Sequence, residues 1–277
     1  MNDTSSQLFY FYDRHPISRD IIIAKVRARR GHLDNLRPED LYEHDQDHYG
    51  GLNATDELAR QAQIGPGTVV ADFCAGLGGT VRYLAHKYKA DVTGIEFTPV
   101  RAAGAEELTR LVGLQESARI LEGNVMDAPL ADTSFDAVIS QEAFCHIPDV
   151  RKALAEARRI LKAGGRLAFT DWIAHRPLSA AEAQLMWDGM AIQPLRSMPE
   201  YQDLVESVGF RVLSVIDLTE EWRPILKERL AMYQRLREEA RHSGTPMGHD
   251  AFHESYVLFV DLIQQRKLGG VRIVANK

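Results

Sequence analysis

The sequence predicts an α/β fold, with a mostly parallel sheet of seven strands, helices on both faces and a helical cap. Short apolar runs alternate with helical segments of ten or more residues through the middle of the chain, as parallel strands require. A glycine-rich turn follows the first of these runs. The 277 residues, of which 45% are hydrophobic, suffice for one large domain or for a core with an appended part.

Six strands and the helices between them are expected in order along the core. The first strand covers residues 68–73 and leads through the glycine-rich turn into a helix that ends near His86. The later strands are expected at 91–96, 118–122, 135–140, 166–171 and 211–218. One helix is expected at 99–114, where apolar residues share one face. Another follows Asp149, a suitable N-cap, and stops at 162–165.

The two ends of the chain are expected to form a cap over the sheet. The predicted parts are an N-terminal helical lid at 1–60, a core at 61–220, a helical cap insertion at 221–268 and a last core strand at 269–277. In an open α/β sheet, ligands bind outside the carboxyl ends of the strands. A cap at this edge would therefore enclose a ligand.

Composition argues against several classes of protein. The formal net charge of -6 disfavours nucleic acid and anionic membranes as partners, because both require a positive surface. No apolar run reaches the roughly 18 residues of a membrane span, and the start lacks a signal-peptide pattern, so a cytoplasmic location is expected. Two cysteines make no disulfide framework. His44 and His48 could share a helix face, but no third ligand accompanies them and no metal is predicted.

The glycine-rich turn at 72–79 has the composition of a loop that lets the backbone approach a ligand at a helix N-terminus. Glu96 ends the second strand, where a carboxylate can accept hydrogen bonds from both ribose hydroxyls. A dinucleotide dehydrogenase would need glycine where Val81 stands. Tyr83 and Lys87 have the spacing of a dehydrogenase catalytic pair, but they lie on the first helix and the match is interpreted as coincidence.

With these motifs in view, the sequence resembles the Rossmann-like, class I S-adenosylmethionine-dependent methyltransferases. The resemblance covers about residues 65–220 and is carried by VVADFCAGLGGT, VTGIE, EGNVMDAPLADTSFDAVIS, ARRILKAGGRLAFTD and YQDLVESVGF. Together and in this order, these segments are highly specific. The resemblance implies S-adenosylmethionine as the cofactor, methyl transfer as the reaction and a reversed last hairpin, which the strand at 269–277 completes.

The same resemblance implies which residues hold the cofactor. Its methionine part would bind at the turn that contains Asp72, Cys74, Ala75, Gly76, Gly78 and Gly79. Glu96 would bind the ribose, with Phe97 beside the adenine. Asn124 and Val125 would meet the adenine edge, and Asp127 is either a further polar contact or a capping or surface acid. Cys74 replaces the first glycine of the family motif, and Asn124 stands where many members have aspartate.

Shorter segments favour a small-molecule N-methyltransferase within this class. SQEAFCHIPD, at 140–149, is similar to the same region of glycine, sarcosine and dimethylglycine N-methyltransferases, and so is the ending KLGGVRIVANK. DHYGG, at 47–51, is similar to an N-terminal lid segment of those enzymes and of some C-methyltransferases that act on isoprenoid diphosphates. An amine nitrogen is therefore the favoured acceptor atom.

Several residues are candidates for the acceptor side of the site. An amine must arrive neutral, so a nearby base or a desolvating pocket is expected. His146 is either that base or a structural histidine at a helix entry. Gln141 is placed at the cofactor's amino-acid end or at the substrate, and Glu142 either faces the substrate or lies on the surface. The next candidates are His48, Tyr49 and Trp172.

Other functions stay open at this point. A small metabolite such as an isoprenoid diphosphate or a phenol would be methylated at carbon or oxygen, although no clustered Arg and Lys for a diphosphate is evident. A non-catalytic subunit would bind S-adenosylmethionine without forming product, and a dehydrogenase would bind a nicotinamide cofactor instead. The sequence decides neither the identity of the small-molecule acceptor nor whether the chain forms a homodimer.

Overall fold

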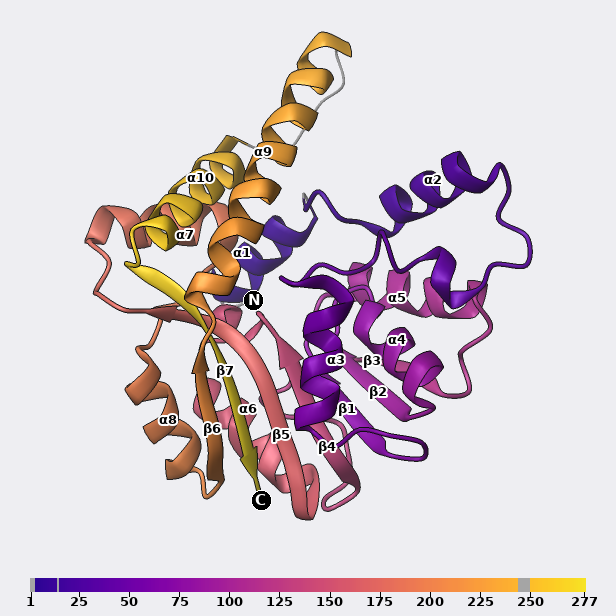
Figure 1. The fold of residues 1–277 in the computed structure, drawn as a ribbon, viewed down its shortest axis with the longest axis vertical. Helices are drawn as coiled ribbons and strands as arrows, with labels where there is room; N and C mark the ends of the chain where they lie inside the picture. The colour runs from indigo at the N-terminus through magenta and orange to yellow at the C-terminus, as the bar shows by residue number, and fades with distance from the viewer. Residues whose placement is uncertain (1–2, 14, 244–249) are drawn as a thin grey trace.

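The computed structural model describes residues 3–13, 15–243 and 250–277, and it confirms the predicted α/β architecture (Figure 1). The strands are β1 (Val69–Phe73), β2 (Asp91–Glu96), β3 (Ala118–Glu122), β4 (Phe135–Gln141), β5 (Leu161–Ala174), β6 (Arg211–Asp217) and β7 (Leu268–Asn276). They form one seven-stranded sheet in the order β3-β2-β1-β4-β5-β7-β6. Strand β7 lies antiparallel to both β5 and β6, so the expected reversed hairpin is present.

The helices of the described residues follow the predicted alternation. They are α1 (Asp3–Tyr12), α2 (Arg19–Arg30), η1 (Pro38–Asp40), α3 (Gly51–Gln61), α4 (Gly79–Tyr88), α5 (Pro99–Leu111), η2 (Phe144–His146), α6 (Val150–Ile160), α7 (Ala180–Met190), α8 (Met198–Ser207), α9 (Thr219–Ser243) and α10 (Asp250–Gln264). Asp149 caps α6 as predicted, since its side chain accepts a hydrogen bond from the Lys152 amide at 3.2 Å. Ser179 and Ser197 begin α7 and α8 with capping boxes. Local sequence signals therefore set these helix starts.

The start of β5 differs from the prediction. Helix α6 runs directly into β5 at Leu161, whereas a stop between the two elements was expected at 162–165. Phe135 of β4 pairs with Leu161 and Ala137 pairs with Arg166, so the extra residues form an irregularity inside the strand. The glycines do break regular structure, but they break it within β5.

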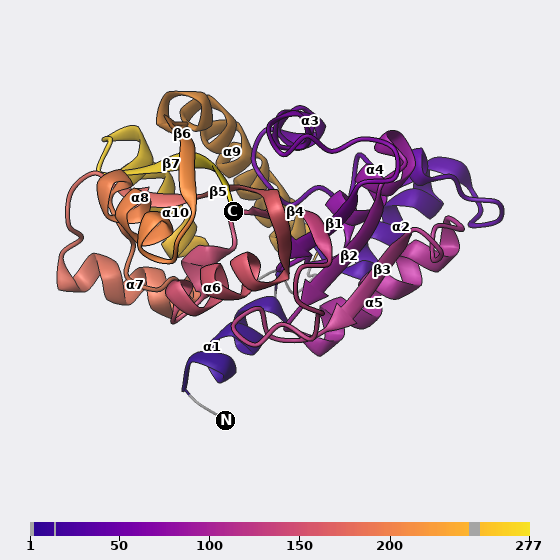
Figure 2. The same cartoon turned by 90° about the horizontal axis from the view of Figure 1, so that it is seen from below.

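The sheet is covered on both faces (Figure 2). On one face, Leu58 of α3, Leu84 of α4 and Ala105 of α5 belong to one buried cluster with the strands. On the other face, Leu154 of α6 and Val205 of α8 belong to a second cluster. The predicted lid therefore contributes α3 to the core layer. Because both faces are buried, the open edge for a ligand is the carboxyl end of the strands.

A cap lies over that end of the sheet. Trp172 of β5, Trp222 of α9 and Phe259 of α10 share one buried cluster with residues of α1 and α7. Figure 1 shows α9 and α10 extending beyond the body of the molecule, beside α7 and α1. Residues 1, 2 and 14 of the predicted lid lie outside the described residues. Among the described helices, none has the length and apolar character to cross a membrane.

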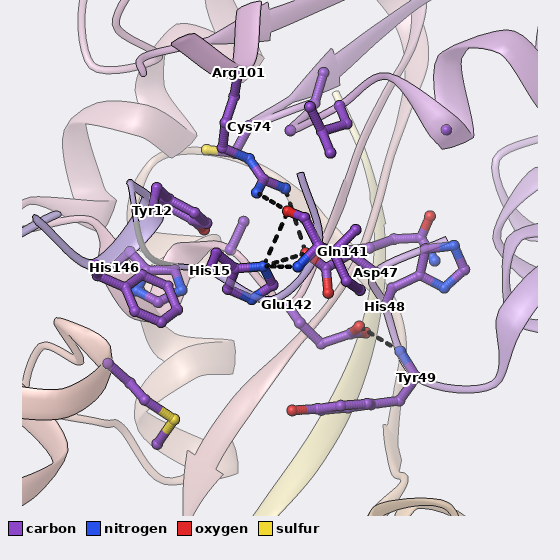
Figure 3. Close-up of a pocket in the computed structure, with 18 of the residues that line it drawn as sticks. Tyr12, His15, Asp47, His48, Tyr49, Cys74, Arg101, Gln141, Glu142 and His146 are labelled. Atoms are coloured by element: carbon purple, nitrogen blue, oxygen red, sulfur yellow. Dashed lines mark hydrogen bonds and ion pairs between the residues drawn. The ribbon is translucent and has the colours of Figure 1, made fainter. Parts of the chain in front are cut away.

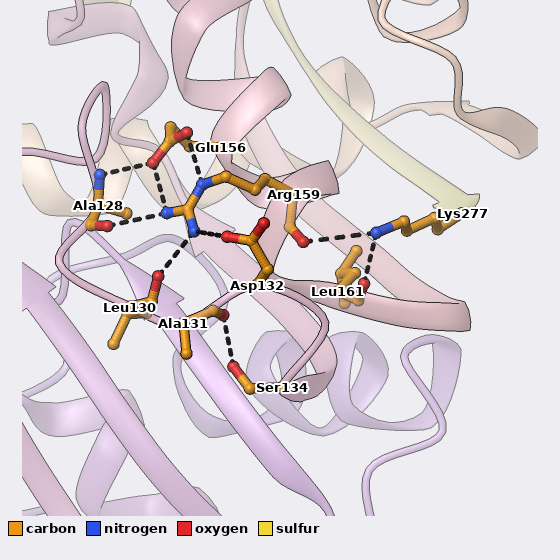
Figure 4. Close-up of polar contacts among 9 residues, drawn as sticks. All are labelled: Ala128, Leu130, Ala131, Asp132, Ser134, Glu156, Arg159, Leu161 and Lys277. Atoms are coloured by element: carbon orange, nitrogen blue, oxygen red, sulfur yellow. Dashed lines mark hydrogen bonds and ion pairs between the residues drawn. The ribbon is translucent and has the colours of Figure 1, made fainter.

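One arginine fixes the loop that follows β3. Arg159, on α6, donates to the carbonyl oxygens of Ala128 at 2.9 Å and of Leu130 at 2.8 Å (Figure 4). Its guanidinium also pairs with Glu156 at 2.7 Å and with Asp132 at 2.5 Å. The loop between β3 and β4 is thereby held against α6, and it carries residues that line the site described next.

Candidate active site

Two adjoining pockets open at the carboxyl ends of the central strands, beneath the cap. The first, which we call the chamber, is lined by the lid, the glycine-rich turn, the loop after β4 and the cap helices (Figure 3). The second, which we call the side pocket, is lined by α1, the end of β2 and the loop after β3. The two pockets share Tyr12, Cys74, Ala143 and His146. One elongated ligand could therefore occupy both.

The glycine-rich turn has an unusual backbone. Cys74, Gly76 and Gly78 have φ angles of 64°, 57° and 74°, all in the left-handed region that favours glycine. The Ala75 amide donates to the Ile95 carbonyl at 2.9 Å, which ties the turn to β2. Asp72, Cys74, Ala75, Gly76 and Gly79 line the chamber, whereas Gly78 does not. The N-terminus of α4 consequently faces the chamber, in an arrangement suited to an anionic group.

Glu96 is buried and precisely oriented at the end of β2. One carboxylate oxygen accepts from the Gly76 amide at 2.8 Å, and the other accepts from the Thr98 amide at 2.8 Å. Each carboxylate oxygen can accept further hydrogen bonds. Because Glu96 lines the side pocket, it is available to a ligand diol.

The predicted adenine contacts surround the side pocket. Phe97, Asn124 and Val125 all line it. Phe97 stacks on Phe9 of α1, with ring centroids 5.4 Å apart, so the first helix closes over this pocket. The Asn124 side-chain oxygen accepts from the Met126 amide at 2.9 Å. Asp127 is exposed and lines neither pocket.

Asp72 and Gln141 each present to the chamber a polar atom for which the described residues supply no hydrogen bond. Burial, and then the nearby charge of Glu96, raise the pKa of Asp72 to about 8, and within the described residues its carboxylate makes no hydrogen bond. The Gln141 side-chain oxygen accepts from the Thr80 hydroxyl at 2.8 Å, while its buried amide nitrogen has no partner among the described residues. These two groups match the ammonium and the carboxylate of an amino-acid end on a ligand.

The lid loop before α3 closes directly on the glycine-rich turn. The fully buried Asp45 carboxylate pairs with Arg82 of α4 at 2.9 Å. The Asp45 carbonyl lies so close to Gly79 that a Cβ there would be 2.1 Å away. Asp47 pairs with Arg101 of α5 at 3.3 Å. The segment that contains His44 and His48 forms turns and bends, so the two histidines do not share a helix face as their spacing suggested.

The two candidate histidines are neutral near pH 7. Burial, and then the positive charge of Arg229, lower the pKa of His48 to about 4. Burial likewise lowers the pKa of His146 to about 4, with its Nδ1 lying 3.4 Å from the Ala191 carbonyl. Figure 3 shows the His146 ring beside Tyr12. An imidazole with so low a pKa is a weak base and acts better as a hydrogen-bond acceptor.

Glu142, which the sequence left open between surface and substrate, lies in the chamber. Its φ of 47° is left-handed, and such strain in a non-glycine residue is often found at functional sites. One carboxyl oxygen accepts from the Tyr49 amide at 2.8 Å (Figure 3). The other accepts from the Thr170 hydroxyl at 2.6 Å. Burial nevertheless raises its pKa to about 7. Glu142 is therefore suited to accept a proton at neutral pH.

Aromatic side chains form the wall of the chamber beneath the cap. Trp172 and Tyr49 both line the chamber. Trp172 stacks on Phe259 with centroids 3.8 Å apart and an interplanar angle of 10°. Its buried ring N–H has no partner among the described residues. These aromatic faces suit a cationic or apolar ligand group.

The N-terminal lid, helix α5 and the cap helices supply chamber residues that the sequence analysis did not select. They include His15, Asp47, Arg101, Arg229, Tyr233 and Tyr256. For α9, a signal was present: Trp222, Leu226, Arg229 and Tyr233 recur at helical spacing and mark one face. That spacing predicts which face of α9 is buried, but it does not predict which residues that face contacts.

Comparison with known proteins defines the class. Residues 71–169 match the family model described as a methyltransferase domain. This match identifies residues 71–169, which include the glycine-rich turn and the ends of β2 and β4, as a methyltransferase domain.

The chain is also similar to individual proteins. It is 29% identical over 188 residues to the sarcosine/dimethylglycine N-methyltransferase of Halorhodospira halochloris, a match that covers 68% of this chain and 65% of that protein. A putative sarcosine dimethylglycine methyltransferase from Galdieria sulphuraria superposes with a TM-score of 0.72 at 22% identity, over 82% of this chain and 86% of that one. The [4+2]-cyclase SpnF superposes with a TM-score of 0.70 at 17% identity, over 95% and 97%.

The chain spans less than two thirds of the curated relatives that it matches first, namely 65% of one and 29% of another. Other curated relatives are named as O- and C-methyltransferases. The unpartnered Gln141 amide nitrogen and the buried Asp72 carboxyl fit the amino-acid end of S-adenosylmethionine. The reacting atom of the acceptor is a separate question.

Proposed function

We propose that this protein transfers a methyl group from S-adenosylmethionine to an amine nitrogen of a small molecule. The observation that carries the proposal is the Glu142 carboxyl, buried in a chamber next to the cofactor residues and with a pKa raised to about 7 by burial. The chamber adjoins the side pocket through shared residues. The names of the sarcosine/dimethylglycine relatives add support for an amine acceptor.

The cofactor would lie across the two pockets. Its amino-acid end would meet Asp72, Gln141 and the backbone of the glycine-rich turn. Its ribose would meet Glu96, and its adenine would lie among Phe97, Asn124 and Val125 under helix α1. Cys74, at the junction of the pockets, would lie beside the centre of the cofactor. Asp127 is a weaker candidate, since it is exposed.

The bound cofactor supplies a methyl group that its sulfonium already activates. The protein's own part is to deliver a neutral amine in line with that group and to keep water away. The ionised Glu142 carboxylate takes the proton of the incoming ammonium, which frees the nitrogen lone pair for attack. Tyr49 and Trp172 provide aromatic faces along the chamber that favour the cationic product.

The candidate histidines then have positioning roles. With pKa values lowered to about 4 by burial, His48 and His146 stay neutral and each can accept a hydrogen bond from the acceptor. His146 lines both pockets, so it is suited to shape the passage between cofactor and acceptor. Glu142 has the more suitable pKa for removing the proton.

Calorimetric titration with S-adenosylmethionine, S-adenosylhomocysteine and NAD tests the cofactor. Micromolar binding of the first two alone is expected, whereas binding of NAD alone or of none would overturn the proposal. Mass spectrometry then tests methylation of small amines against phenols and isoprenoid diphosphates. Product from the phenols or diphosphates alone would move the reaction to oxygen or carbon. Cofactor binding without any methylated product would favour a non-catalytic role, or a different reaction on a fold that the [4+2]-cyclase also has.

A further inference from the structure

A buried acid outside the two pockets is tied to the loop after β4. Asp171, on β5, is 1% exposed and lines neither the chamber nor the side pocket. One carboxylate oxygen accepts from the Cys145 amide at 3.1 Å, and the other accepts from the Tyr201 hydroxyl at 2.7 Å. Both oxygens therefore have a donor from outside the sheet, the first from η2 and the second from α8.

Strand β5 also fixes Glu142, through the residue that precedes Asp171. The Glu142 amide donates to the Thr170 carbonyl at 2.8 Å, while the Thr170 hydroxyl donates to the Glu142 carboxyl at 2.6 Å. Asp171 then holds the amide of Cys145, three residues further along the loop. Two consecutive residues of β5 thus hold the loop at two points, and His146 follows directly.

Tyr201 anchors this arrangement to the core. It is 1% exposed, and its ring packs against Phe169 of β5 with centroids 5.3 Å apart. Phe169 in turn packs against Phe144 of the loop, with centroids 5.1 Å apart. Burial raises the pKa of Asp171 to about 6, and the hydrogen bond from Tyr201 opposes that rise. Asp171 is therefore mostly ionised at pH 7.

The thiols and the phenol around Asp171 stay neutral. Burial raises the pKa values of the Cys74 and Cys145 thiols and of the Tyr201 phenol well above their usual ranges. Arg196 carries a charge near this phenol and lies 5.8 Å from the centroid of its ring. Among these neighbours in the described chain, Asp171 is thus the group that changes charge near neutral pH.

The charge of Asp171 acts on Glu142. Burial is the main reason that the pKa of Glu142 rises to about 7, and the negative charge of Asp171 adds to that rise. Arg229 of α9 and the hydrogen bonds from Thr170 and the Tyr49 amide act in the opposite direction. Two neighbouring buried carboxyls ionise one after the other, since the first charge disfavours the second.

We propose that Asp171, fixed by Tyr201, is a positioning residue for methyl transfer: it holds the loop after β4, and its negative charge makes Glu142 a stronger base. This inference rests on the proposed function and adds to it a residue that lies outside both pockets. When Glu142 takes the proton of the ammonium, it becomes neutral beside the charged Asp171. That step removes a repulsion between like charges, which favours the transfer.

Asp171→Asn tests the charge. The substitution removes the negative charge and replaces one of the two accepting oxygens by a donor. The midpoint of Glu142 ionisation is expected to fall by about half a pH unit or more, because a like charge no longer opposes it. Infrared difference titration of the S-adenosylhomocysteine complex measures this midpoint, and Glu142→Gln identifies the carboxyl band. This measurement does not depend on turnover.

Kinetics test the consequence for the reaction. The acid limb of kcat should move to lower pH in Asp171→Asn, and kcat above the limb should fall about tenfold, because a weaker base removes the proton. Tyr201→Phe keeps the carboxylate and removes one of its hydrogen bonds. This variant is expected to lower kcat about fivefold and to keep its affinity for S-adenosylhomocysteine.

Asp136→Asn is the matched control. Asp136 lies at the opposite end of β4 from the loop, where its carboxylate accepts from the Val69 amide at 2.9 Å and from Lys162 at 2.7 Å. Its loss should lower stability while the Glu142 midpoint and kcat stay as in the wild type.

The outcomes separate this inference from the proposed function. An unchanged Glu142 midpoint in Asp171→Asn, or an equal shift in Asp136→Asn, would overturn the inference while methyl transfer stands. If Asp171→Asn does not fold, full kcat in Tyr201→Phe would overturn it. A wild-type protein that binds S-adenosylhomocysteine and methylates no amine would instead contradict the proposed function, and the infrared titration would still decide whether Asp171 acts on Glu142.

Discussion

Burial shifts the pKa values of Glu142 and His146, which both follow β4, in opposite directions. Removing a group from water disfavours its charged form, which raises the pKa of a carboxyl and lowers that of an imidazole. Glu142 and His146 lie four residues apart, and burial shifts the pKa of the first to about 7 and of the second to about 4. The carboxyl is therefore the group that changes protonation near neutral pH.

Glu142→Gln is expected to lower kcat by about 10²–10⁴-fold, the usual contribution of a general base. In the wild type, the ionised base form accumulates as pH rises through about 7, so kcat should rise over that range. The variant should lose this acid limb and keep its affinity for S-adenosylhomocysteine. Steady-state rates from pH 5.5 to 9 measure both effects. An unchanged limb in the variant would exclude Glu142 as the base.

Glu96→Ala is expected to weaken S-adenosylhomocysteine binding by about 1–3 kcal/mol, because the cofactor's hydroxyls would lose a charged partner. Glu122→Ala is the matched control: Glu122 ends the neighbouring strand, pairs in register with Glu96 and is exposed. Isothermal titration measures both affinities. Equal affinity in the two variants would remove Glu96 from the cofactor site.

The lid loop is the element that joins the cap to the core. Asp45 and Asp47 are tied to α4 and α5 by ion pairs, the Tyr49 amide is tied to Glu142, and Arg229 holds two carbonyls from the cap. The loop therefore contacts α4, α5, the loop after β4 and α9, which lie far apart in sequence. Its place over Gly79 explains why the glycine-rich turn tolerates no side chain there.

Asp45→Ala is expected to destabilise the protein by about 3–5 kcal/mol, because it leaves the Arg82 guanidinium buried without its carboxylate. Glu43→Ala is the control, since Glu43 makes an exposed ion pair with Arg29 that should contribute less than about 1 kcal/mol. Urea unfolding followed by circular dichroism gives both free energies of unfolding. A loss in Asp45→Ala no larger than that of the control would contradict a stabilising role for the buried pair.

In the whole molecule, the ligand space is bounded by the sheet edge, the lid and the cap together. A cofactor that contacts all three binds the folded state only, so its binding free energy adds to the stability of the entire chain. Because helices cover both faces of the sheet, the cofactor can bind only at the carboxyl ends of the strands.

S-adenosylhomocysteine at 100 times its Kd is expected to stabilise the folded protein by about 2.7 kcal/mol. This corresponds to an increase in Tm on the order of 5–10 °C for a chain of this size. NAD at the same concentration should leave Tm unchanged. Differential scanning calorimetry makes the comparison, and an equal increase with NAD would speak against a specific cofactor site.

The sequence alone determined the core of the fold, and most of the residues that it assigned to the cofactor line one of the two pockets. Local backbone preferences are enough to form the strands, the helix start at Asp149 and the glycine-rich turn, so these elements could be predicted from short segments. Phe97, Asn124 and Val125 were assigned through the family resemblance, and all three line the side pocket. The start of β5 at Leu161 was not predictable, because it depends on pairing with Phe135 of β4, while residues 162–165 form an irregularity inside the strand.

Only the tertiary structure decided the acceptor side. Whether Glu142 faces solvent or the chamber depends on contacts with Tyr49 and Thr170, which are remote in sequence. The same holds for Arg229 and Tyr256, since helical spacing reveals an inner face but not the group opposite it. Burial of these polar side chains is a property of three packed segments together. The raised pKa of Glu142 and the unpaired polar atoms of the chamber arise only when the lid, the core and the cap pack together.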